Sequence, residues 1–273
     1  TNKVELPKKD ILSNIDFQNQ EKFWIFDNQE HIDDLKFWKK QKDAFVRTFL
    51  GQAVAFDKED ADAILEGQLS SITLNFFLEK ILKDEALNNK FLLLNAELYF
   101  DFTKMKEKEE DLDNLLQGYL KNIDPDWNNK KVIFPINIDN SHWISVIIDH
   151  FEEVIYVIDP YGKEYKDVAE NIQFFLDWLI DKRSNLTKIK YKYVFKTNNT
   201  ILQKSDDVEN CGVFTIMYFT YYIKYGKFPT KKDFKYDDID DVRKYIYHII
   251  TLVLKCPPGK KLNIKTKRCI KDK

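Results

Sequence analysis

The hydrophobic pattern of the chain changes character near residue 131. Before that point, apolar residues recur every three or four positions, which is the spacing of one face of a helix. The segment 21–56 therefore predicts one or two helices with aromatic side chains turned inward. The six positions predicted to be buried there are Phe23, Trp24, Phe26, Trp38, Phe45 and Phe49.

Two further segments in the first half carry the helical pattern. In "QLSSITLNFFLEKILKD", Ser70 or Ser71 can cap a helix, because a serine oxygen accepts from the free N–H groups of the first turn. Its apolar side would carry Ile72, Phe76, Phe77 and Ile81. Residues 111–123 repeat the pattern and predict another helix.

From residue 131 the chain alternates strands with helices. Runs rich in β-branched residues, bounded by turn residues, predict strands at 131–138, 143–149, 153–159 and 189–197. Between the third and fourth runs, apolar residues at helical spacing predict a helix that packs on the sheet. They are Val168, Ile172, Phe175, Leu176, Leu179 and Ile180.

Two helices close the predicted fold. The segment "CGVFTIMYFTYYIKYGK", from Cys211, is apolar nearly all round and stops at Gly226, which predicts a central helix buried on most sides. Residues 238–254 predict a last helix. The fold class expected from this order is α+β, with a small mixed sheet flanked by helices.

Composition describes an ordered protein without an obvious charged partner. Apolar residues make up 44% and aromatics 15% of 273 residues, with seven glycines and seven prolines. The formal net charge of −2 gives no field that would attract nucleic acid or anionic lipid. No apolar run approaches the roughly 18 residues that span a bilayer. We therefore expect a monomer of a reducing compartment, with neither a nucleic-acid nor a membrane partner.

The pattern suggests three parts. Residues 1–60 form a helical N-terminal extension, 61–254 the main domain, and 255–273 a basic tail. Cys256 and Cys269 in the tail could form a disulfide, bind a metal with further ligands, or stay reduced. No Cys-x-x-Cys or histidine spacing supports zinc, so we expect no metal and no cofactor.

Cys211 is the first candidate for chemistry because it begins the buried helix. The free amides and positive dipole end of a helix favour a thiolate, and Gly212 would let a substrate backbone come close. A nucleophilic cysteine also needs a base that takes its proton and later returns it to the leaving group.

His142 is the histidine best placed for that role. It precedes Trp143 at the head of one strand, and Asp159 ends the next strand 17 positions later. If the two strands pair as a hairpin, their outer ends meet, and the carboxylate can orient the imidazole. His31 and His248 lie in helical patterns. Asp149 and His150 are adjacent at a turn, where we expect both to be solvated.

An oxyanion hole requires donors aimed at a developing negative oxygen. Gln203, eight residues before Cys211, can supply a side-chain amide beside the Cys211 backbone N–H. The candidate catalytic residues therefore occur in the order His142, Asp159, Gln203 and Cys211.

These residues carry a family resemblance. The segments "PINIDNSHWISVIIDHFEEVIYVIDPYG", "QLSSITLNFFLEKIL" and the glutamine before "NCGVF" resemble the ubiquitin-like-protein-specific cysteine proteases, over residues 65 to 225. That group contains SUMO proteases, deneddylases and, more distantly, adenovirus-type maturation proteases. The resemblance implies a papain-like fold and thiol hydrolysis after a glycine-ended tail, with His142 as general base, Asp159 as its orienter, Gln203 as oxyanion donor and Cys211 as nucleophile.

The sequence departs from the SUMO proteases at one wall of the substrate tunnel. They usually show Trp-Leu-Asn-Asp before the first shared helix, where the Trp roofs the tunnel and the Asp contacts SUMO. Here the positions are Gln68, Leu69, Ser70 and Ser71. Trp143 remains as the other wall. The resemblance thus implies Trp143, Gly212, Gln68 and Ser71 as substrate-binding residues, and it favours ubiquitin over SUMO.

Several functions stay open at this level. The leading hypothesis is a deubiquitinase that cleaves the (iso)peptide bond after the C-terminal glycine of ubiquitin or a related modifier. The residue bias and the "CPPG…RC" tail also resemble proteins of large AT-rich DNA viruses, so the alternative is a maturation protease that cuts viral precursors at Gly-Gly-X sites. An acetyltransferase of the same fold ranks below both. The location expected is the cytoplasm or nucleus of a host cell, or a virion.

Overall fold

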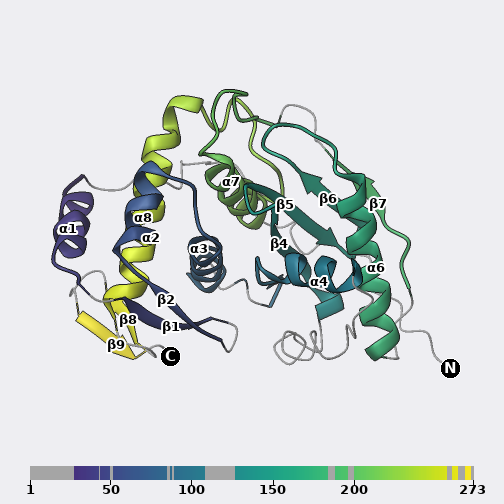
Figure 1. Ribbon diagram of the computed structural model, residues 1–273, viewed down its shortest axis with the longest axis horizontal. Helices are drawn as coiled ribbons and strands as arrows, with labels where there is room; N and C mark the ends of the chain where they lie inside the picture. The colour runs from purple at the N-terminus through teal and green to yellow at the C-terminus, as the bar shows by residue number, and fades with distance from the viewer. Residues whose placement is uncertain are drawn as a thin grey trace.

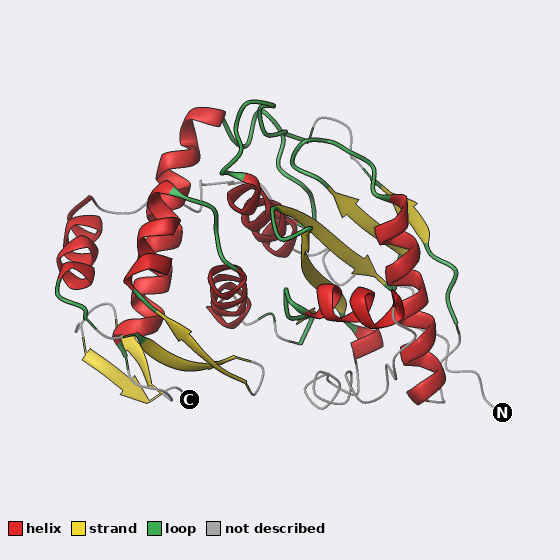
Figure 2. Ribbon diagram, viewed as in Figure 1, coloured by secondary structure: helices red, strands yellow, loops and turns green. Residues whose placement is uncertain are grey.

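The computed structural model describes residues 28–42, 44–49, 52–84, 87, 89–107, 127–183, 188–195, 200–256, 260–263 and 268–271. A five-stranded mixed sheet forms one end of the molecule, and α7 and α3 lie between this sheet and a long helix, α8 (Figures 1 and 2). The fold is α+β, as the alternation of patterns predicts.

The sheet has the strand order β3-β4-β5-β6-β7. Its central strands β4 (Lys131–Ile138), β5 (His142–Asp149) and β6 (Val154–Ile158) pair antiparallel. The short edge strands β3 (Phe91–Leu93) and β7 (Lys192–Val194) pair in parallel with their neighbours. The three central strands match the predicted ones. The fourth is shorter than predicted, and β3 was not predicted.

Helices bury both faces of the sheet. Ile133 and Ile147 belong to one apolar core with α7 (Cys211–Tyr225), while Val132 and Val146 belong to a second core. The second core is covered by α4 (Leu98–Glu107) and α6 (Lys166–Arg183), which lie on the other side of the sheet in Figure 1. Burial of both faces explains why the strands are apolar without alternation.

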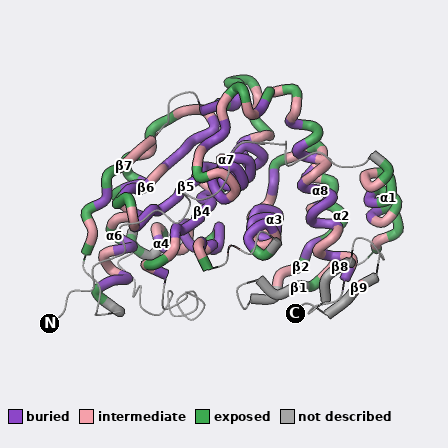
Figure 3. Tube along the Cα trace, turned by 180° about the vertical axis from the view of Figure 1, so that it is seen from behind, coloured by how far each residue is buried: buried purple, intermediate pink, exposed green. Residues whose placement is uncertain are grey.

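The central helix α7 is buried over almost its whole length. Its residues from Cys211 to Ile223 are all buried, as the purple tube in Figure 3 shows. It packs against α3 (Ser71–Asp84), α8 (Ile239–Lys255) and β5. Gly226 ends it in the left-handed conformation, with φ +65°, and donates to the Tyr222 carbonyl. Burial on all sides and the glycine stop agree with the sequence prediction.

The N-terminal part differs from the prediction. It consists of α1 (Asn28–Lys39), a hairpin of β1 (Phe45–Phe49) and β2 (Gln52–Phe56), and α2 (Lys58–Glu66). The expectation of helix at Phe45 and Phe49 is wrong, because the β-branched and aromatic residues around them favour extended backbone. Phe23, Trp24, Phe26 and the predicted helix 111–123 lie outside the described residues.

Helix α1 is fastened to α8. The Trp38 indole is buried and donates to Thr251 Oγ1 over 2.9 Å. Asp34, also buried, accepts from His248 Nδ1 at 2.7 Å and from Lys255 Nζ at 2.8 Å. Trp38 and Phe56 belong to the same apolar core as α7. The described part of residues 1–60 therefore contributes to the core of the main domain.

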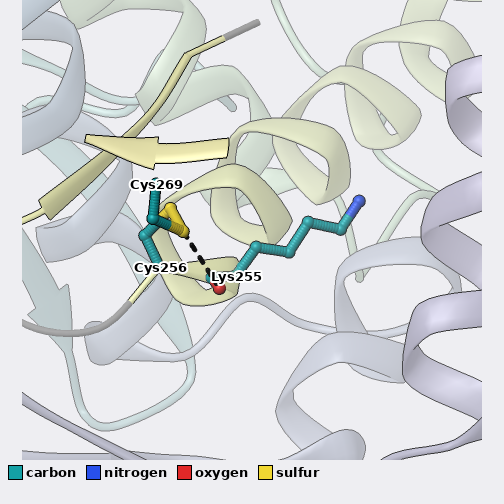
Figure 4. Close-up of a disulfide and its surroundings, with 3 residues drawn as sticks. All are labelled: Lys255, Cys256 and Cys269. Carbon is teal, nitrogen blue, oxygen red and sulfur yellow. Dashed lines mark hydrogen bonds between the residues drawn. A yellow bond between two sulfur atoms is a disulfide. The ribbon is translucent and has the colours of Figure 1, made fainter. Parts of the chain in front are cut away.

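The C-terminal segment is held by a disulfide. Cys256, just after α8, is bonded to Cys269 in β9 (Arg268–Lys271), which pairs with β8 (Lys260–Asn263). Figure 4 shows the bond beside Lys255, whose carbonyl lies 3.8 Å from the Cys269 sulfur. Of the three states that the sequence left open, the structure has the disulfide. No described helix combines the length and apolarity needed to cross a membrane.

Asp149 and His150 are both buried, so the expectation that they are solvated is wrong. Asp149 is 0% exposed and pairs with Lys131 Nζ at 2.7 Å. It also accepts from Tyr222 OH and from the backbone N–H groups of Phe151 and Glu152. A turn between buried strands can lie inside the fold when such bonds satisfy it.

We predict that Lys131→Met destabilises the protein by about 3 kcal/mol, because it leaves the Asp149 carboxylate buried without its charged partner. The Lys83→Met variant is the matched control. Its ion pair with Glu79 spans 2.9 Å, but the two side chains are 52% and 27% exposed, and we expect less than about 1 kcal/mol. Urea unfolding of both variants measures the difference, and equal effects would contradict the prediction.

Candidate active site

The hairpin brings His142 and Asp159 together. Ser145 pairs with Ile158, so the residue after β6 lies beside the first residues of β5. His142 Nε2 is hydrogen-bonded to Asp159 Oδ1, and Asp159 is 1% exposed. The second oxygen of Asp159 accepts from the Lys163 backbone N–H at 2.7 Å. Both oxygens are thus held, and the carboxylate fixes the plane of the imidazole.

Cys211 is the third group that interacts with His142. It is the first residue of α7, is 2% exposed, and carries a free thiol. Its sulfur is within electrostatic reach of the His142 imidazole, which it attracts when ionised. Because Nε2 is engaged with Asp159, Nδ1 is the nitrogen left for the sulfur. The three residues that the sequence selected therefore form one chain of contacts.

The charge partners of His142 raise its pKa. Burial alone lowers the pKa, but hydrogen bonds and Coulomb attraction from Asp159 and Cys211 outweigh it, and the result is a pKa of about 9. The Tyr161 ring stacks on the imidazole with centroids 5.0 Å apart. The imidazole is consequently cationic at neutral pH, which is the state that pairs with a thiolate.

Gln203 is fixed at the other end of the loop that leads to Cys211. Its backbone N–H donates to the Pro160 carbonyl at 2.8 Å, next to Asp159. Its side-chain Nε2 donates to the Asp207 carbonyl at 2.6 Å, while Oε1 is buried without a hydrogen-bond partner among the described residues. The amide has a second N–H hydrogen. Its role toward an oxyanion stays a prediction.

Asp207 organises this loop, although it was not among the residues predicted from the sequence. Its carboxylate accepts from the backbone N–H groups of Glu209 and Asn210, from Asn210 Nδ2 and from the Tyr236 hydroxyl. Burial raises its pKa, but these bonds, led by Tyr236, lower it on balance. The signal available in the sequence was an aspartate that can accept from backbone N–H groups two and three residues later.

Gly212 is closely packed within this chain, and its expected contact with a substrate backbone stays a prediction. A Cβ atom there would lie 2.9 Å from Leu69 Cβ and 3.2 Å from Trp143 Cδ1. The close approach found in the structure is therefore by two side chains of this chain. Trp143 is 3% exposed and donates to the Leu69 carbonyl at 2.7 Å. Leu69, Trp143 and Gly212 form one packed wall beside Cys211.

A cavity of about 330 Å³ adjoins this wall. Gln68, Ser71 and Trp143, three of the predicted substrate-binding residues, line it together with Glu97. Gln68 Nε2 donates to the Val208 carbonyl at 3.1 Å, and Ser71 Oγ donates to Glu97 Oε1 at 3.0 Å. Its other lining residues are Leu69, Ser70, Ala96, Phe100, Asn137 and Asn140. The cavity lining is mostly polar, and among the described residues that form it Glu97 is the charged one.

A cysteine at the start of a buried helix, next to a histidine that an aspartate holds, on an α+β fold of this kind defines a papain-like cysteine protease. The model of the Ulp1 protease family, C-terminal catalytic domain, matches residues 65–257. The chain belongs to this family. No curated protein sequence matches it significantly.

Solved structures share the fold. The SUMO protease Ulp1 with its catalytic cysteine oxidised to a sulfenic acid has a TM-score of 0.61 at 20% identity, covering 84% of this chain and 97% of that one. The Ulp1 protease domain in complex with Smt3, the yeast ortholog of SUMO, has a TM-score of 0.61 at 18% identity, with coverages of 83% and 95%. The Chaetomium thermophilum Ulp1-like SUMO protease catalytic domain gives 0.59 at 13%, with coverages of 86% and 92%.

We predict that Asp159→Asn lowers kcat by about 10²-fold, because His142, the expected general base, loses the charge that orients it and stabilises its protonated form. The pKa of His142 should fall from about 9 toward its ordinary value of 6.5, so the alkaline limb of the pH–rate profile moves to lower pH. Kinetics across pH and NMR titration of His142 measure both effects. Asp139→Asn, an exposed aspartate with φ 52° in the adjacent turn, is the control.

The same pKa shift links pH to stability in the unmodified protein. The folded-state pKa of His142 is raised, so its contribution to stability is complete below pH 6.5 and is lost as the pH rises through about 9. Asp159→Asn should flatten this part of the stability–pH curve. An unchanged slope between those values would show that the ion pair does not form.

Proposed function

We propose that this protein is a deubiquitinase, in which Cys211 attacks the carbonyl carbon of the C-terminal glycine of ubiquitin in an (iso)peptide bond. The observation that carries the proposal is the contact chain Asp159–His142–Cys211 at the start of α7. Protonated His142 beside a thiolate is the resting state that this geometry favours.

In the first half of the reaction, the sulfur forms a bond to the carbonyl carbon and the oxygen becomes negative. The helix N-terminus offers the Cys211 N–H, which has no acceptor within the helix, and Gln203 supplies a side-chain amide. His142 then gives its proton to the nitrogen, the C–N bond breaks and the amine leaves. A thioester between Cys211 and the modifier remains.

In the second half, His142 takes a proton from water as the water oxygen attacks the thioester. The carbon–sulfur bond breaks, and the sulfur leaves as a thiolate beside the newly protonated imidazole. The carboxylic acid that forms loses its proton to solvent, so the products are a free C-terminal carboxylate and the starting enzyme. Asp159 keeps the imidazole in place through both halves, because its two oxygens are held by His142 and by the Lys163 backbone N–H.

The cavity beside Trp143 is the proposed site for the residues that precede the terminal glycines. The position that resembles the tunnel-roofing Trp is Gln68, whose side chain bonds to the Val208 carbonyl. Ser71 takes the position of the Asp that contacts SUMO. These departures favour ubiquitin over SUMO as the modifier.

A panel of modifiers tests the substrate. Ubiquitin, SUMO and NEDD8, each with a thiol-reactive group in place of the C-terminal carboxylate, are incubated with the full chain, and adducts are located by mass spectrometry. We expect the ubiquitin adduct at Cys211 to form at least tenfold faster than the others, and Cys211→Ala to form none. A faster SUMO adduct would replace ubiquitin by SUMO in the proposal.

Two other results would replace the deubiquitinase by a different activity. Cleavage of Gly-Gly-X peptides without any modifier adduct would select precursor processing, and transfer of label from acetyl-CoA would select acetyl transfer. A truncated variant that tests the N-terminal region should lack residues 1–27 only, because Trp38 and Phe56 are part of the apolar core. Deletion of the first sixty residues would remove that packing along with any substrate contact.

We predict that Glu97 makes the cavity select against acidic side chains before the two glycines. With peptide substrates carrying Arg, Gln or Glu at the residue before Gly-Gly, kcat/KM should decrease in that order. Glu97→Gln should reduce the Arg-to-Glu preference about tenfold, since it removes the negative charge from the cavity lining but keeps an acceptor for Ser71 Oγ. Ser71→Ala is the control that keeps the charge, and an unchanged preference in Glu97→Gln would contradict the prediction.

A further inference from the structure

Arg243 of α8 is a buried arginine next to the loop that carries the nucleophile. It is 4% exposed, and its guanidinium lies between the C-terminal end of α2 and residues 209–210. The catalytic steps described above do not use it. A charged group removed from water in this way is costly unless its surroundings compensate it.

All five N–H groups of the guanidinium have acceptors. Nε donates to Asn210 Oδ1 at 2.8 Å. Nη1 donates to the Ile64 carbonyl at 2.7 Å and to the Ala63 carbonyl at 3.4 Å. Nη2 donates to the Gly67 carbonyl at 2.8 Å and to the Glu209 carbonyl at 3.2 Å. Arginine is the only side chain with enough N–H groups, in one planar guanidinium, to donate to all these acceptors at once.

These bonds connect the loop that precedes α3 to the loop that precedes α7. Gly67 leads directly to Gln68 and Leu69, and Leu69 packs against Gly212 and Trp143. Asn210 immediately precedes Cys211, and its Nδ2 donates to both carboxylate oxygens of Asp207 at 2.9 Å. Movement of Arg243 would therefore shift Leu69 and the start of α7 relative to each other.

Within the described part of the chain, no direct ion pair neutralises the charge of Arg243. Its hydrogen-bond acceptors there are backbone carbonyls and the Asn210 amide, and none is a carboxylate. The carbonyl end of α2 carries partial negative charge and compensates part of it. Glu209, Asp207 and Asp240 attract it from further away, and so does Cys211 when the sulfur is ionised. The guanidinium charge that remains uncompensated attracts the ionised sulfur of Cys211.

We propose that Arg243 is a positioning residue, which fixes the loop before Cys211 against Leu69 and stabilises the thiolate of Cys211 electrostatically. The inference rests on the proposed role of Cys211 as nucleophile. His142, Tyr161 and Arg243 interact electrostatically with the ionised sulfur, and Asp159 and Asp207 act through their contacts with these groups. Of the cations among them, Arg243 is the one that does not exchange a proton.

The test measures the reactivity of Cys211 without any modifier. The rate of alkylation by iodoacetamide is followed against pH in the full chain under non-reducing conditions, where Cys256 and Cys269 are bonded to each other. In Arg243→Met we expect the pH midpoint of alkylation to rise. With the substrate found in the modifier panel, kcat should fall about 10²-fold with little change in KM. Arg243→Lys keeps the charge but loses the fork, so its midpoint should stay closer to that of the unmodified protein while kcat still falls.

Two further variants separate positioning from folding. Asn210→Ala removes the acceptor of Nε outside the apolar core, and its effect on kcat should not add to that of Arg243→Lys, because both break the same connection. Lys244→Met removes the neighbouring charge of α8 and is the control that should leave both readouts unchanged. If the Arg243 variants unfold more easily but the folded fraction keeps the same alkylation midpoint and kcat, Arg243 is structural only. Failure of the modifier panel would leave the alkylation result unaffected.

Discussion

The pairing register of β5 with β6 is the constraint on which the active site depends. Ser145 opposite Ile158 places Asp159 beside the head of β5, where His142 begins the strand. A slip of one residue would turn every side chain of one strand to the opposite face, and the two apolar cores of the sheet forbid it. The hydrophobic packing of Ile147 against one core and Val146 against the other thus fixes the histidine–carboxylate contact.

Helix α7 supplies Cys211, the third residue of the active site, and is buried from Cys211 to Ile223. A helix buried on every side has little freedom to rotate or slide, so its first residue has a defined place. The cost is that its first turn lies in the protein, where its free N–H groups need acceptors or a ligand. The loop 203–210 places polar groups next to this buried end, and Asp207 and Arg243 hold the loop through hydrogen bonds to Asn210.

The sequence predicted those parts of the structure in which one local pattern decides the outcome. Strands 131–138 and 143–149, the central helix with its Gly226 stop, and the proximity of His142 to Asp159 follow from periodicity and hairpin geometry. It failed at 45–49, where the aromatic and β-branched residues of a short segment favour a strand although apolar positions around it recur at helical spacing. Asp149 was misjudged because its partners, Lys131 and Tyr222, are far away along the chain. The roles of Gly212 and Arg243 were also out of reach, since each depends on contacts between distant segments.

The difference between residues fixed by the core and residues on the cavity wall explains which features of the site can vary. The His142–Asp159–Cys211 contacts are fixed by the sheet and by a helix inside the core, so substrate preference has to be set elsewhere. Gln68, Ser71 and Glu97 lie on the wall of a cavity whose lining is held by hydrogen bonds between side chains and loops. Substitution there changes the shape and charge of the cavity at small cost to the core. The family chemistry is therefore carried by buried, mutually constrained residues, whereas the proposed choice of modifier falls to residues whose packing constrains little else.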